Sequence, residues 1–140
     1  MGVENTLVES WLYTTLSTDA TLVAQVGTRI YSYVAPTTAT TPYVVFNAQS
    51  PGFDVMGVGT ARVMLNCLYQ VKVVVQDASF STAKAAANRI DALLHGATGA
   101  PTGGEVLGCV REGPLAYAEV TDGIEYRHLG GLYRIWVQSD

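Results

Sequence analysis

The sequence RVMLNCLYQVKVVVQ, from Arg62 to Gln76, decides the fold. Every second residue from position 63 to position 75 is apolar, whereas the alternate positions include Asn66, Gln70 and Lys72. Strict alternation predicts a β-strand with one face buried and the other in water. Such a strand would extend about 50 Å, whereas a compact domain of this length is only about 37 Å wide. We therefore predict that the strand bends at a bulge or projects as part of a long β-hairpin arm.

Helices and strands are also predicted before this stretch. Residues 3–16 place apolar side chains at helical spacing, and capping oxygens at Ser17, Thr18 or Asp19 introduce a shorter helix that ends at Gly27. Residues 29–34 and 43–48 have the composition of strands and flank a Thr-rich loop bounded by prolines. Residues 50–60 contain several glycines, and we predict a long loop there.

A helix follows the long strand. Small and aliphatic residues recur at helical spacing between positions 83 and 94, which predicts a helix packed closely on the sheet. Its capping residue is predicted to be Asp77, Ser79 or Ser81, and Gly96 is predicted to end it.

Three further strands are predicted over residues 106–112, 115–120 and 126–137. Asp122-Gly123 is typical of a tight hairpin turn, and Gly130-Gly131 predicts a bulge. The order of helices, strands, helix and strands predicts one α+β domain over residues 1–140. We expect a mainly antiparallel sheet packed against two or three helices, with a long β-hairpin arm.

Composition excludes several classes of protein. The chain has 140 residues, of which 49% are hydrophobic and 14% charged, unlike the composition of disordered chains. Its net charge is −4 and it has no basic run, so the electrostatic signature of nucleic-acid binding is missing. No apolar run approaches the roughly 20 residues of a membrane-spanning helix, and we expect no membrane association.

The sequence has no clear catalytic, cofactor or metal motif. The Gly-rich stretch before Arg62 begins like a dinucleotide fingerprint, but Arg62 stands in place of its third glycine. We interpret His95 as a positively charged residue at a helix C-terminus and His128 as a solvent-facing or interface ring. Cys67 shares the parity of its apolar neighbours and is predicted to be buried, whereas Cys109 is ambiguous. We expect no enzymatic activity, no cofactor and no metal.

Apolar residues stand out in the segment predicted to be a loop. Phe53, Val55, Met56 and Val58 lie between two strands, interleaved with glycines. One interpretation is a loop folded back over the core. The other is a hairpin tip that binds a partner or another subunit, because exposed apolar patches usually mark contacts.

Several segments together resemble the tail-completion or tail-terminator proteins of tailed bacteriophages. These are residues 12–31, the segment TPYVVF at 41–46, the long strand with its alanine-rich helix ending LLHG at 93–96, and the closing strand at 126–137. The resemblance implies an α+β structural protein of the virion neck, assembled in the host cytoplasm. It implies a ring, commonly a hexamer, that caps the head-proximal end of the tail tube and joins tail to head.

The implied partners are further copies of the chain, the tail tube protein and a head-completion or neck protein. Because the chain is acidic, we expect DNA to pass through the ring lumen without specific binding. One alternative is another neck component, such as a head-completion protein, or a tail tube subunit. A remote alternative is a small host enzyme or ligand-binding domain.

Overall fold

A computed structural model describes residues 3–140, which fold around a single sheet. The elements are α1 (Glu4–Ser17), α2 (Ala20–Val26), β1 (Ile30–Ser32), β2 (Tyr43–Met56), β3 (Arg62–Val75), α3 (Lys84–Leu94), β4 (Gly104–Thr121) and β5 (Ile124–Ser139). The strand order is β1-β2-β3-β5-β4; β1 runs parallel to β2, and the other neighbours are antiparallel. The predicted α+β class and mainly antiparallel sheet are confirmed.

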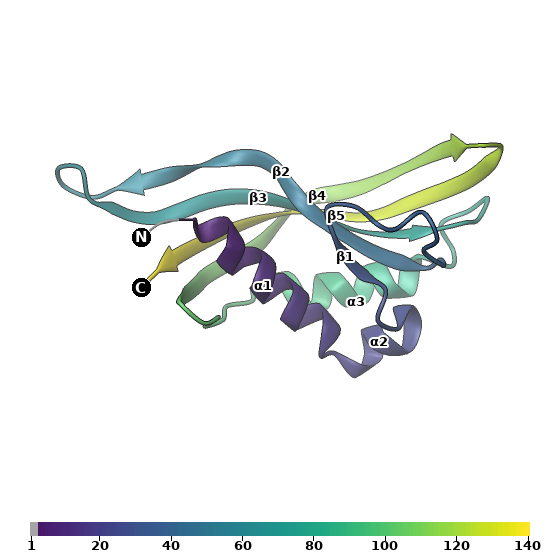
Figure 1. The fold of residues 1–140 in the computed structure, drawn as a ribbon, viewed down its shortest axis with the longest axis horizontal. Coiled ribbons are helices and arrows are strands. Elements are labelled where there is room, and N and C mark those ends of the chain that lie inside the picture. Colours follow the sequence, from purple (N-terminus) through teal and green to yellow (C-terminus); the bar gives the residue numbers. More distant parts are fainter. Residues whose placement is uncertain (1–2) are drawn as a thin grey trace.

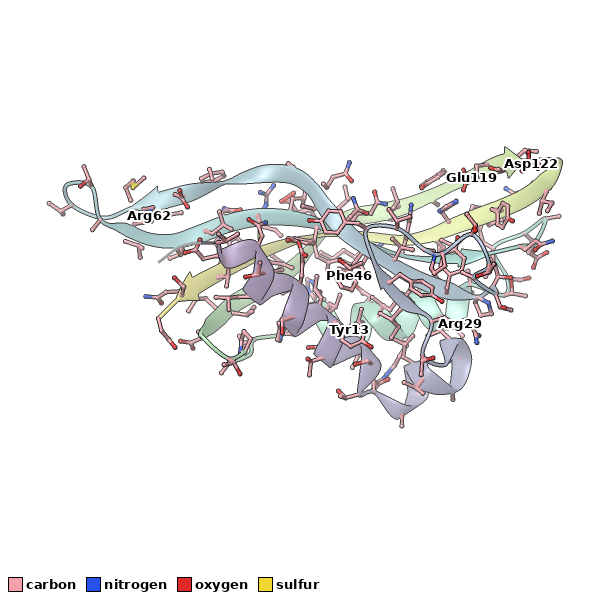
Figure 2. The ribbon with its side chains drawn as sticks, viewed as in Figure 1. Tyr13, Arg29, Phe46, Arg62, Glu119 and Asp122 are labelled. Carbon is pink, nitrogen blue, oxygen red and sulfur yellow. The ribbon has the colours of Figure 1, made fainter. Side chains whose placement is uncertain are left out.

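The helices cover one face of the sheet, as Figure 1 shows. The alternation in β3 is the reason: Cys67, Tyr69, Val71 and Val73 are buried against the helices, while the intervening side chains are mostly only half-buried. Phe46 of β2 lies in the same layer, between sheet and helices (Figure 2). The core therefore lies between the middle of the sheet and the helical layer.

The sheet extends beyond this core in two opposite directions (Figure 1). The first arm, residues 53–64, is the end of the β2–β3 hairpin, and the part of β3 that it contains, before Leu65, does not pair with β5. The second arm, residues 119–126, is the end of the β4–β5 hairpin beyond Arg127. Arg127 is the β5 residue nearest the turn that still pairs with β3. The predicted long hairpin arm is confirmed, and a second arm that we did not predict accompanies it.

The predicted loop over residues 50–60 is mostly strand. β2 continues to Met56, so only residues 57–61 form the turn of the first arm. Shifts of register after Ala48, after Ser50 and after Val55 allow this glycine-containing segment to pair as part of the strand. Gly52, with a φ of 76°, lies so close to β3 that a Cβ there would be 2.6 Å from the carbonyl oxygen of Asn66.

Two further strand boundaries differ from the prediction. The segments 106–112 and 115–120 form one continuous strand, β4, because a register shift between Arg111 and Gly113 accommodates the break. Gly130 and Gly131 pair regularly with both neighbouring strands, so the predicted bulge at this pair is wrong.

Helix capping was predicted correctly at one helix and incorrectly at another. The carboxylate of Asp19 accepts a hydrogen bond from the backbone N–H of Leu22 at 2.9 Å and caps α2. The N-cap of α3 is Ala83, and its side chain makes no capping bond. Asp77 instead accepts bonds from the N–H of Ala78 and the hydroxyl of Thr82, which stabilise the turn before α3. Within residues 3–140, none of the helices has the length and apolar character needed to cross a membrane.

Candidate assembly surface

The first arm exposes the apolar residues that the sequence singled out. Phe53, Met56 and Val58 are 58%, 55% and 103% exposed, and Val55 is half-buried. The interpretation that this segment folds back over the core is therefore wrong. The β2–β3 hairpin projects beyond the helical layer (Figure 1), so its turn does not cover the core.

The second arm forms one wall of a pocket of about 320 Å³. The opposite wall comes from the loop between β1 and β2, at Pro36 and Thr37. Apolar surface is supplied by Tyr43, Ile124 and Tyr126, and the carboxylates of Glu119 and Asp122 also line the pocket. Ile124 and Val120 add exposed apolar surface to this arm. No local sequence pattern indicates this pocket, because the pocket joins segments about 80 residues apart in the chain.

A buried histidine anchors the base of the second arm. His128 is 5% exposed, its Nε2 lies 2.6 Å from Oε1 of Glu119, and its ring stacks on Tyr117. The hydroxyl of Tyr117 accepts a hydrogen bond of 2.7 Å from Nζ of Lys72. The prediction that His128 faces solvent is wrong. Strand parity places its ring on the face of the sheet away from the helices, but side chains of the neighbouring strand cover the ring there.

The charge state of this cluster follows from burial. Burial lowers the pKa of His128, and its hydrogen bond to Glu119 opposes that shift only in part. The neutral ring therefore donates its Nε2 proton to Oε1 of Glu119, a residue that also lines the pocket. Burial also raises the pKa of Tyr43, with Tyr126 and Glu119 acting in the same direction, so its phenol stays protonated.

The other residues that we considered as candidates for chemistry have structural roles. His95 is the C-cap residue of α3, as expected, and its Nδ1 accepts a hydrogen bond of 3.0 Å from the N–H of Arg111, so the ring also ties α3 to β4. Cys67 and Cys109 are free and buried, and burial raises the pKa of each thiol to about 12. Both cysteines lie opposite Ile135 in the register of β5.

The acidic residues are distributed over separate ion pairs. Glu112 pairs with Arg134 and Glu125 with Arg127, each with a nitrogen–oxygen distance of 2.6 Å. In the part of the chain that the structure describes, no cluster of three or more His, Cys, Asp or Glu side chains is arranged to hold a metal ion.

The architecture defines a class of protein. A small α+β core carries two arms directed away from each other, and both arms present exposed apolar side chains beyond the core. Exposed apolar patches of this kind mark interaction surfaces. This is the architecture of a small structural subunit that works in contact with other proteins.

Comparison with known proteins identifies the family. The family model "Tail completion protein gp17" matches residues 11–138. The chain therefore belongs to the gp17 family of tail completion proteins, and it is a structural tail protein of phage-like virions.

Solved structures agree with this assignment. A chain from the virion of the native gene transfer agent (GTA) particle is 25% identical, with a TM-score of 0.71 over 94% of this chain and 96% of that one. A second solved chain, 17% identical, has the same fold, with a TM-score of 0.60 over 99% of both chains. No curated protein sequence matches the chain significantly.

Proposed function

We propose that the protein assembles into a ring, a hexamer, that caps the head-proximal end of the tail tube and joins the tail to the head. The observation that carries this proposal is the pair of oppositely directed arms (Figure 1). A contact between different surfaces of two identical subunits repeats head to tail and closes into a ring when the rotation between subunits permits it. Membership of the tail completion family supplies the virion context.

The exposed residues of the first arm are proposed as the main contacts. Phe53, Val55, Met56 and Val58 would bury their apolar surface against a neighbouring subunit or a tail component. Each square ångström of apolar surface removed from water contributes about 25 cal/mol to association. The ring would hold the tail tube protein on one side and a head-completion or neck protein on the other, without an enzymatic step.

Assembly can be measured on the purified protein. Light scattering should report a hexamer or a concentration-dependent equilibrium between monomer and ring. Electron micrographs of the protein mixed with tail tubes should show density at one end of each tube. A strict monomer at high concentration with tubes present would contradict the proposal. Binding along the whole tube would favour a tube subunit, and binding to tailless heads alone would favour a head-completion protein.

A further inference from the structure

The end of the first arm and the second-arm pocket lie at opposite ends of the molecule. Figure 2 places Arg62 near the end of the first arm, whereas Glu119 and Asp122 lie at the far end of the sheet. The chain cannot fold this arm into its own pocket, because the whole core separates them. Each subunit therefore carries one projecting tip and one distant pocket.

The tip and the pocket are chemically complementary. The tip, residues 56–62, has the sequence MGVGTAR, in which Val58 is fully exposed and Arg62 is exposed and positively charged. The pocket offers apolar surface from Pro36, Ile124 and two tyrosines, together with two carboxylates. An apolar side chain beside a cation thus matches an apolar pocket lined by anions.

One of the two pocket carboxylates is held in place before any contact forms. Glu119 is bonded to the buried His128, so its carboxylate is fixed at the pocket wall. Asp122 lies in the turn of the second arm with a φ of 53°, which fixes its backbone in the left-handed region. Within residues 3–140, neither carboxylate forms an ion pair with a lysine or an arginine.

We propose that the tip of one subunit, residues 56–62, enters the second-arm pocket of the next copy of the chain. Val58 enters the pocket, and Arg62 faces Glu119 and Asp122. The apolar contact provides most of the affinity. The charge pair fixes the register of the contact, because solvent-exposed ion pairs add little affinity. The inference rests on the proposed ring, in which every tip then occupies one pocket.

Disulfide trapping tests this contact directly. Val58→Cys would be combined with a cysteine on either pocket wall, Thr37→Cys or Ile124→Cys, because a disulfide requires Cα atoms within about 7 Å. The native Cys67 and Cys109 can stay, since both are buried and their thiols are protonated at neutral pH. Mild oxidation should convert at least one double variant into a covalent ladder that ends at the ring size.

Matched controls separate this contact from random collision. Each single variant should give at most dimers, and Val58→Cys combined with Thr14→Cys, an exposed position on α1, should give no ladder. If micrographs show rings but neither pocket pair forms a ladder, the arm-to-pocket contact is wrong while the proposed function stands. If the native chain forms no ring at all, the proposed function itself fails.

A charge test covers the case in which the cysteine variants fold poorly. Arg62→Gln and Asp122→Asn each remove one charge, and asparagine tolerates the positive φ at position 122. Each change should raise the concentration needed for assembly about twofold to fivefold, and the double variant should be no weaker than the weaker single variant. Fully additive effects would overturn the pairing.

Discussion

The guanidinium of Arg89 on α3 donates two hydrogen bonds to the carboxylate of Asp19, at 2.6 and 2.9 Å. The same carboxylate caps α2 through the N–H of Leu22. One side chain therefore connects two helices that are about 70 residues apart in the chain. This contact fixes the end of the helical layer under the sheet.

Asp19→Ala should destabilise the fold, because it removes both the cap and the ion pair. Losing an N-cap costs about 0.5–2 kcal/mol. Asp19→Asn, which keeps a capping oxygen and loses the charge, should cost less than Asp19→Ala. Urea denaturation of the three proteins at pH 7 measures the difference, and equal losses for both variants would contradict a capping role.

The pH dependence follows from the same contact. The hydrogen bonds from Arg89 lower the pKa of Asp19 from 3.8 to about 2. Because this pKa is lowered by folding, the contribution of Asp19 is complete above pH 3.8 and is lost as the pH falls toward 2. The stability difference between the native chain and Asp19→Asn should stay constant from pH 8 to 5 and shrink only below pH 4. A difference that disappears near pH 6 would implicate another group.

Ile90 and Lys84 test the orientation of α3. Ile90 is 1% exposed and faces the sheet, whereas Lys84 is exposed in the first turn of the same helix. Ile90→Ala should cost about 2–5 kcal/mol because it leaves a cavity, and Lys84→Ala should stay within about 0.5 kcal/mol. Equal effects in thermal or urea denaturation would mean that the helix is rotated.

Gly130 allows β5 to approach β3 closely. A Cβ at this position would overlap the carbonyl oxygen of Val71 and lie 2.6 Å from Cα of Lys72. Gly130→Ala should therefore destabilise the protein by about 1–3 kcal/mol, as overpacking does. Gly113→Ala on β4 is the matched control, because a Cβ there has open space around it and should be nearly neutral. A neutral Gly130→Ala would show that the strands can separate at little cost.

These glycines illustrate how far the sequence predicts the fold. The alternation in β3, the cap at Asp19 and the Asp122-Gly123 turn depend on neighbouring residues, and each was predicted correctly. A glycine pair indicates a local irregularity in a strand, but it does not tell whether this is a bulge or a close approach to the neighbouring strand. Gly130 marks a close approach between strands, and the register shift predicted there lies in β4, between Arg111 and Gly113.

The candidate surface was predictable only in part. The apolar residues of the first arm stand out locally, because loops are usually polar and this segment has the glycines of a loop. The second-arm pocket and the burial of His128 depend on strand register and on contacts between distant segments. Such contacts are properties of the assembled sheet, and no local pattern in the sequence specifies them.

Substitutions in the first arm should impair assembly without affecting folding. Phe53→Ser combined with Met56→Ser removes two exposed apolar side chains, so the melting temperature should change little. The contacts proposed for the first arm would keep Val58 but lose the two largest exposed apolar side chains, so ring formation and the joining of tails to heads should be abolished. Tyr13→Ser, at an exposed tyrosine on α1 away from both arms (Figure 2), should leave both activities intact. A large loss of stability in the double variant would instead assign these side chains to folding.

The last prediction concerns DNA, which the proposed ring must allow to pass. Each subunit carries −4, so six subunits carry −24, and a lumen of that sign repels phosphates. Four of the eight basic side chains, Arg89, Arg111, Arg127 and Arg134, are paired with a carboxylate of their own subunit, which reduces the positive charge available to DNA.

We expect no mobility shift of duplex DNA at about 50 mM salt, for the monomer or for the assembled ring, because binding would lack the release of counterions that drives non-specific association. A micromolar shift that weakens with added salt would contradict this prediction. It would place basic side chains on the lumen.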